Sequence, residues 1–166
     1  MILSEFIYGG MDGVITTVAI IAGILGADIS PKYALVLGLA SLLADGFSMG
    51  ISRYNSLIDL SKAKVTPFMS GLATFVSFVL IGGIPLMPFV FLSFYDETWI
   101  KQAMVWSSVI ALLLIGIVKG MHTKKYLKSI SEIMVIGLVG VTISYQTAKY
   151  VNCLLYTSDA ADDEER

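Results

Sequence analysis

Two carboxylates lie inside apolar stretches of the sequence, and their positions predict a role in chemistry. Asp12 follows a pair of glycines in the first apolar stretch, and Asp45 lies deep inside the second. A charged residue at the centre of a membrane span costs at least about 2.5–3.5 kcal/mol on insertion scales. Both acids are therefore candidate ligands for a cation. The competing interpretation is that each acid lies near a membrane interface and is simply solvated.

The residues around Asp45 share one face of a helix, because they lie three or four positions apart. This face carries Ser41, Asp45, Ser48 and Met49. Carboxylate and hydroxyl oxygens suit Mg²⁺, Ca²⁺ and Mn²⁺, whereas a thioether adds a preference for softer transition metals. The face therefore predicts a transition-metal site, with ordinary packing as the alternative role of the methionine.

Two further candidate ligands accompany Asp12 in the first apolar stretch. Glu5 lies seven residues, or two helical turns, before Asp12 and could receive cations from the cytoplasm. An ordinary interfacial acid is the competing interpretation of Glu5. Met11 is adjacent to Asp12 and is the lesser candidate. His122 lies in a basic segment and is interpreted as a solvated loop residue rather than a ligand.

The composition indicates that membrane-spanning helices hold these residues. Of the 166 residues, 56% are hydrophobic and 14% are charged, and the mean hydropathy is +0.80. Soluble domains carry charge on roughly a quarter of their residues. The sequence shows no Lys/Arg-rich face, so nucleic-acid binding is not expected. The single cysteine, Cys153, excludes a disulfide framework and a cysteine-based zinc site.

We therefore predict an all-α polytopic membrane protein with five transmembrane helices. The predicted spans are residues 6–27, 33–52, 67–91, 99–118 and 130–150. The second-to-third and fourth-to-fifth connections contain most of the basic residues, namely Arg53, Lys62, Lys64, Lys119, Lys124, Lys125 and Lys128. Basic loops stay in the cytoplasm, so the N-terminus is predicted to be cytoplasmic and the C-terminus to lie outside. The same lysines could contact anionic lipid headgroups.

Glycine pairs at four-residue spacing predict close packing of helices in lipid. The pairs are Gly9/Gly13, Gly46/Gly50 and Gly116/Gly120. Such pairs are compatible with a tight bundle or with a homodimer.

The last segment is set apart from the predicted domain of residues 1–152. Residues 153–166 begin with Cys-Leu-Leu-Tyr-Thr-Ser-Asp-Ala-Ala-Asp. This run resembles the in-frame translation of a transposase adapter used in DNA sequencing libraries. We expect residues 153–166 to be non-native, and the alternative is a genuine disordered acidic tail.

Three motifs give the sequence a family resemblance, and the first two are the more specific. The run Phe6-Ile-Tyr-Gly-Gly-Met-Asp12-Gly-Val-Ile-Thr-Thr resembles the first helix of the vacuolar iron transporter family. The run Gly38-Leu-Ala-Ser-Leu-Leu-Ala-Asp45-Gly-Phe-Ser-Met49-Gly resembles its second helix, and Ile84-Pro-Leu-Met-Pro88 resembles the end of its third. The resemblance covers about residues 5–150, although the last three spans match mainly in pattern.

The resemblance implies a five-helix homodimer that exports Fe²⁺, and often Mn²⁺, from the cytoplasm in exchange for protons. It implies a path between the protomers with Asp12 and Met49 as metal-site residues, and no resident cofactor. Three departures are present: Ser41 replaces a glutamate common in the family, Met11 replaces an asparagine, and a long Glu-rich cytoplasmic insertion is missing. The host membrane is expected to be the plasma or inner membrane of a prokaryote or an organelle membrane of a eukaryote.

Competition between metal and protons at the buried acids is the mechanism we expect. Two other functional classes remain open. One is a scaffold or assembly membrane protein in which the acids only bridge helices. The other is an intramembrane aspartyl protease, but such enzymes use Gly-x-Gly-Asp, whereas this chain has Gly9-Gly-Met-Asp12. We therefore do not expect an enzyme.

Overall fold

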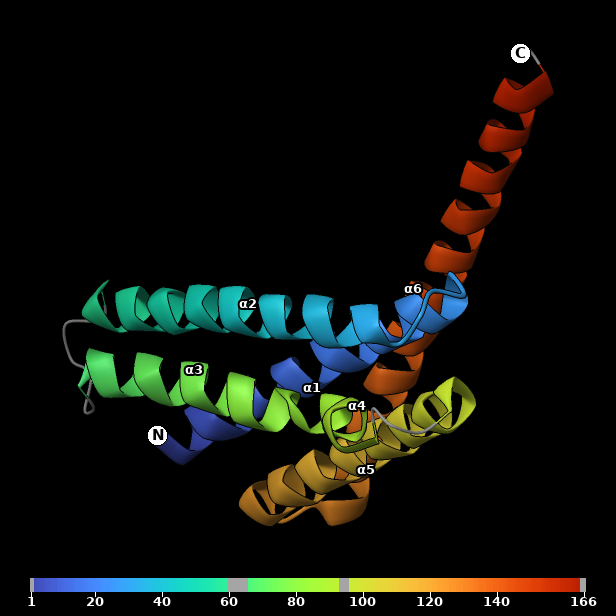
Figure 1. The fold of residues 1–166 in the computed structure, drawn as a ribbon. Helices are drawn as coiled ribbons and strands as arrows, with labels where there is room; N and C mark the ends of the chain where they lie inside the picture. The colour runs from blue at the N-terminus through green and yellow to red at the C-terminus, as the bar shows by residue number, and fades with distance from the viewer. Residues whose placement is uncertain (1, 60–65, 93–95, 165–166) are drawn as a thin grey trace.

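The computed structural model describes residues 2–59, 66–92 and 96–164 of the chain. Helices account for the regular structure of this part: α1 (Ile2–Gly26), α2 (Lys32–Asp59), α3 (Pro67–Gly82), η1 (Ile84–Leu86), α4 (Met87–Leu92), α5 (Glu97–Thr123) and α6 (Tyr126–Glu164). Five helical spans in this part are long and apolar enough to cross a membrane, with α3, η1 and α4 together forming the third. The predicted all-α, five-span architecture is confirmed (Figure 1).

The third span coincides with the predicted residues 67–91, whereas several of the other helices extend beyond the apolar stretches that predicted them. The second span, for example, runs from Lys32 to Asp59 rather than over residues 33–52. Helical hydrogen bonding continues into the polar residues at the ends, which a hydropathy pattern leaves out. Helix α6 likewise continues past residue 152 to Glu164. Lys62 and Lys64, which contributed to the predicted orientation, lie outside the described residues.

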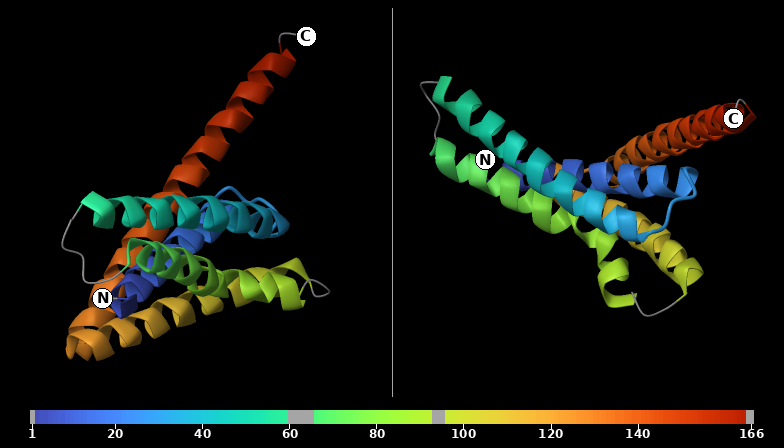
Figure 2. Two further views of the ribbon diagram at one scale, coloured as in Figure 1. Left: turned by 90° about the vertical axis from the view of Figure 1, so that its left-hand side faces the viewer. Right: turned by 45° about the horizontal axis from the view of Figure 1, so that its top comes forward.

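Helix α1 is the centre of the bundle. It packs against α2, α3, α5 and α6, while α2 and α3 lie side by side in the views of Figures 1 and 2. In the most apolar 18-residue stretch of α1, 50% of the residues are buried. The corresponding share is 28% in α2 and 17% in α6. Helix α2 therefore leaves a long face uncovered, and the C-terminal part of α6 projects away from the other helices (Figure 2).

The glycine pairs bring helices together within the chain. A Cβ atom at Gly13 would lie 3.1 Å from Cα of Phe78 on α3, and one at Gly50 would lie 3.0 Å from the carbonyl oxygen of Gly71. A Cβ atom at Gly120 would lie 2.9 Å from Cα of Tyr126 on α6. Such close backbone contact requires the absence of a side chain, so all three pairs contribute to a tight bundle.

Proline interrupts the third span near the end opposite the N-terminus. The chain passes from α3 through η1 into α4, with Pro85 inside η1. The hydroxyl of Ser107 on α5 donates a hydrogen bond of 3.1 Å to the carbonyl oxygen of Pro85. A break inside a membrane span requires such a partner, because lipid offers none to the freed backbone groups.

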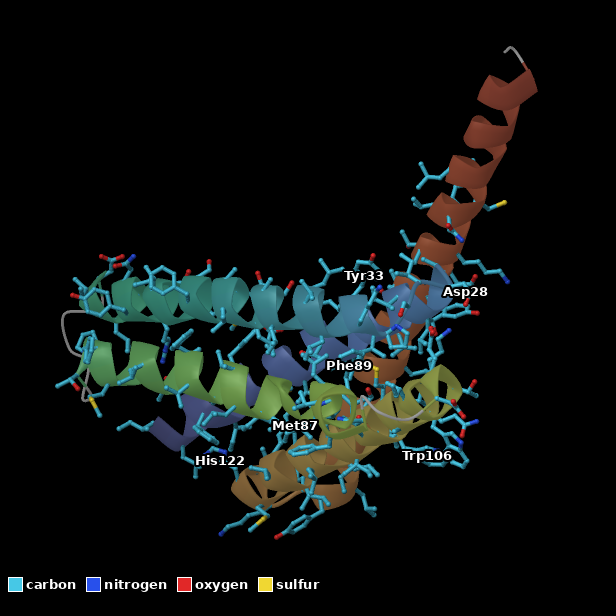
Figure 3. The ribbon with its side chains drawn as sticks, in the orientation of Figure 1. Asp28, Tyr33, Met87, Phe89, Trp106 and His122 are labelled. Carbon is cyan, nitrogen blue, oxygen red and sulfur yellow. The ribbon has the colours of Figure 1, made fainter. Side chains whose placement is uncertain are left out.

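The bundle has two distinct ends. Figure 3 labels Asp28 and Tyr33 near one end and His122 near the other. The end that includes His122 also holds the start of α1, the end of α2 and the turn between α5 and α6 (Figure 1). We call it the basic end, after Arg53, Lys119, Lys124, Lys125 and Lys128.

Candidate metal site on the first two helices

Asp12 and Asp45 are brought together by the packing of α1 against α2. Asp12 is partly buried, Asp45 is exposed, and the two carboxylates are close enough for their charges to repel each other. In the part of the chain that the structure describes, neither carboxylate takes part in a hydrogen bond or an ion pair. A cation bound between two such carboxylates would offset their repulsion. This pair is the centre of the candidate site.

The predicted ligands of α2 are divided between its outer and inner sides. Asp45 and Ser48 are exposed, whereas Ser41 and Met49 are partly buried. Met49 packs against a buried cluster that includes Leu42. Asp45 and Ser48 thus lie toward the outer surface of the chain, whereas Ser41 and the thioether of Met49 lie toward its interior.

Glu5 lies on the α2 side of α1, but it already has a partner. Its side chain is 10% exposed and forms an ion pair with Arg53, whose side chain is 32% exposed. The sequence analysis counted Arg53 only as a basic loop residue and missed this contact. The hairpin register contained the signal, because Glu5 and Arg53 lie about equally far from the turn between α1 and α2.

Met11 is the predicted ligand that the structure places apart from the others. It packs against a buried cluster that includes Ile115 of α5 and Ile133 of α6. Successive residues of a helix point about 100° apart, so adjacency to Asp12 in sequence does not place Met11 on the same side. The structure therefore brings Glu5, Asp12, Asp45 and Met49 to the α1–α2 side, without Met11.

One copy of the chain supplies few acidic ligands for a metal. Among the described residues, no group of three or more His, Cys, Asp or Glu side chains is positioned to hold a metal ion. Asp12, Asp45 and Met49 provide two carboxylates and one thioether. These groups match the donor types of a transition-metal site, but they are fewer than the usual ligand number of such a site.

Five apolar spans define a polytopic membrane protein, and Asp12 and Asp45, which lack partners among the described residues, form its candidate acidic site. The sequence profile of the VIT family matches residues 3–59 and 56–149. The chain therefore belongs to the VIT family, which confirms the resemblance found in the sequence. The matched residues reach all five spans, the fifth as far as residue 149, and end before the segment that begins at residue 153.

Three curated proteins with the name vacuolar iron transporter are similar to part of the chain. The protein of Toxoplasma gondii (strain ATCC 50861 / VEG) is 50% identical over 50 residues, which cover 30% of this chain and 17% of that protein. Those of Plasmodium berghei (strain Anka) and Plasmodium falciparum (isolate 3D7) are each 43% identical over 54 residues, covering 32% of this chain and 20% of each relative. The matches thus span a fifth or less of the relatives' length.

Proposed function

We propose that this chain forms the membrane domain of a transporter that moves Fe²⁺ out of the cytoplasm. The observation that carries the proposal is the pair of unpartnered carboxylates, Asp12 and Asp45, within two adjacent membrane helices. Membership of the VIT family and the names of the three relatives support iron as the cargo. Oxygen donors beside the thioether of Met49 also suit Mn²⁺, which we propose as a second cargo.

Exchange of metal for protons follows from the chemistry of carboxylates. A bound cation favours the ionised carboxylate, whereas removal from water favours the protonated one. Metal and protons therefore compete for Asp12 and Asp45. In our proposal the basic end faces the cytoplasm, as the distribution of basic residues favours. Fe²⁺ arrives from that end, and protons arriving from the opposite side release it.

A second copy of the chain would complete the site. Asp45 and Ser48 are exposed on α2, although α2 is long and apolar enough to span a membrane. Acyl chains are a poor environment for a carboxylate, and intramembrane acids almost always face a bundle interior or a water-filled cavity. We propose a homodimer that covers this face of α2, so that each Asp45 lines a path between the two copies.

Flux through reconstituted protein tests the proposal directly. Proteoliposomes would take up Fe²⁺ under anaerobic conditions, with a metal-sensitive dye and a pH-sensitive dye inside the vesicles. We expect Fe²⁺ flux coupled to opposite proton movement, and we expect Asp12→Asn to reduce both to the level of empty vesicles. The amide cannot exchange a proton or supply an anionic ligand.

Asp28→Asn is the matched control, because it makes the same acid-to-amide change in the turn after α1. Asp28 adopts a left-handed backbone conformation with φ of 53°, which asparagine tolerates well. The control should transport Fe²⁺ like the wild type. Wild-type flux in Asp12→Asn would contradict the assigned role of Asp12, and absence of flux in the wild type would contradict the proposed function.

A further inference from the structure

The ion pair between Glu5 and Arg53 joins the basic ends of the two helices that carry the candidate site. Glu5 lies in the first turn of α1 and is buried, with 8% of its surface exposed. Arg53 lies on α2, four residues after Met49 and eight after Asp45. These spacings place Asp45, Met49 and Arg53 on one side of α2. The contact with Glu5 shows that α2 lies against α1 at Arg53, whereas Asp45, two turns away on α2, is exposed.

The ion pair lies at a different depth from the two unpartnered carboxylates. At 1.5 Å per residue, Glu5 is about 10 Å from Asp12 along α1, and Arg53 is about 12 Å from Asp45 along α2. The two helices run antiparallel, so these similar offsets put Asp12 and Asp45 at nearly the same depth. The ion pair thus lies between the carboxylates and the basic end, along the same seam between α1 and α2.

We propose that the guanidinium of Arg53 is a tethered cation that occupies Glu5 and must be displaced before a metal ion can pass from the basic end to Asp12 and Asp45. The inference rests on the proposed transport function and adds a regulatory residue to it. Glu5 is the acid of α1 nearest the basic end, so an incoming cation meets it before Asp12. With Arg53 in place, the charge of Glu5 is already neutralised.

The way Arg53 is held makes its displacement feasible. Its Nε atom is buried and has no hydrogen-bond partner among the described residues, while about a third of its side chain remains exposed. A buried donor without a partner destabilises the conformation that holds it. Rotation of the guanidinium toward the exposed side would hydrate that donor, and a divalent cation at Glu5 would replace the lost charge.

A purely structural ion pair predicts a different outcome from a displaceable one. If Arg53 only fastens α1 to α2, its removal should lower stability and leave the affinity for metal unchanged or weakened. If Arg53 competes with metal for Glu5, its removal should strengthen metal binding. Fe²⁺ binding and transport therefore separate the two roles.

The first test measures Fe²⁺ affinity by anaerobic equilibrium dialysis and initial Fe²⁺ uptake by proteoliposomes at subsaturating metal. We expect Arg53→Gln to bind Fe²⁺ about fivefold more tightly, which is the competition expected from an ion pair worth about 1 kcal/mol. Uptake at low Fe²⁺ should rise in the same direction. Arg53→Lys, which keeps the positive charge, should behave like the wild type, and the double variant Glu5→Gln/Arg53→Gln should lose the gain.

Lys119→Gln is the matched control, because it breaks an ion pair between α5 and α6, Lys119–Glu132, in which neither α1 nor α2 takes part. It should leave Fe²⁺ affinity unchanged. A folded Arg53→Gln protein with wild-type affinity and uptake would overturn the inference. The proposed function would still hold if the wild type transports Fe²⁺ and Asp12→Asn does not, even where Arg53→Gln behaves like the wild type. An inactive wild type would instead remove the function itself.

A second test uses the unaltered protein and does not depend on the folding of a variant. Arg53 and Arg166 are the arginines of the sequence, so an arginine-selective dicarbonyl reagent followed by peptide mass spectrometry reports on Arg53 individually. Fe²⁺ should accelerate modification of Arg53 because metal at Glu5 releases the guanidinium. Arg166 should react at the same rate with and without metal. Equal rates for Arg53 in both conditions would overturn the inference.

Discussion

The α1–α2 and α5–α6 hairpins resemble each other in construction but differ in how they treat charge. Each is an antiparallel pair with an ion pair near the basic end, Glu5–Arg53 in the first and Lys119–Glu132 in the second. Between Lys101 and Lys119, and again between Glu132 and Lys149, the second hairpin has no charged residue. The first hairpin places Asp12 and Asp45 within its spans.

The charged residues of α5–α6 hold two helices together, whereas Asp12 and Asp45 of α1–α2 remain available to bind a cation. In α5–α6, Lys119 is 12% exposed and its amine lies 3.0 Å from the carboxylate of Glu132. In α1–α2, the two inner carboxylates repel each other and lack partners among the described residues. Charged side chains inside a membrane are rare and usually functional. The first hairpin therefore has the features of a site, and the second has those of a support.

Among these predictions, the largest effect is expected from the replacement of Asp45 by leucine, which removes a carboxylate of the candidate site. The change removes an exposed carboxylate from a membrane helix, and insertion scales assign such a charge about 2.5–3.5 kcal/mol at the membrane centre. We expect Asp45→Leu to fold at least as stably as the wild type while Fe²⁺ flux falls to the level of empty vesicles. Thermal unfolding in detergent and flux in proteoliposomes measure the two effects. Full flux in this variant would show that Asp45 is an ordinary surface acid.

The sequence predicted the features of this site that depend on local composition. Five spans follow from apolar runs, which the structure confirms. The role of Asp12 and Asp45 follows from the free energy of a charge in lipid and stays a prediction. The partner of Glu5 could not be read in the same way, because it depends on how α1 and α2 pack. Arg53 was therefore interpreted only as a basic loop residue, although it contacts Glu5.

The sequence also does not reveal which face of each helix a neighbouring helix covers. A stripe at three- and four-residue spacing predicts a shared face, but it does not say which face a neighbouring helix covers. The structure exposes Ser48 and partly buries Met49. Met11 packs toward α5 and α6 for the same reason, since the central position of α1 gives each of its sides a different partner.

A smaller effect is expected from Gly120→Ala, which tests whether the second hairpin acts only as a support. The added Cβ would lie 2.9 Å from Cα of Tyr126 and would push α5 and α6 apart. Overpacking of this kind destabilises proteins by about 1–3 kcal/mol. We expect a lower thermal midpoint and unchanged Fe²⁺ flux per folded molecule. A fall in flux larger than the loss of folded protein would assign α5–α6 a part in transport.

The smallest effect is expected from Glu132→Gln, which makes the ion pair of α5–α6 comparable with that of α1–α2. Glu132 is 47% exposed, so solvent screens its attraction to Lys119. The glutamine can still accept a hydrogen bond from the lysine. We expect a loss of no more than about 1 kcal/mol in stability, measured by thermal unfolding in detergent, with Fe²⁺ affinity unchanged. The corresponding change at Glu5 should instead alter Fe²⁺ binding, because that acid lies on the seam leading to Asp12 and Asp45. Equal effects of Glu5→Gln and Glu132→Gln on metal affinity would remove the distinction between the two hairpins.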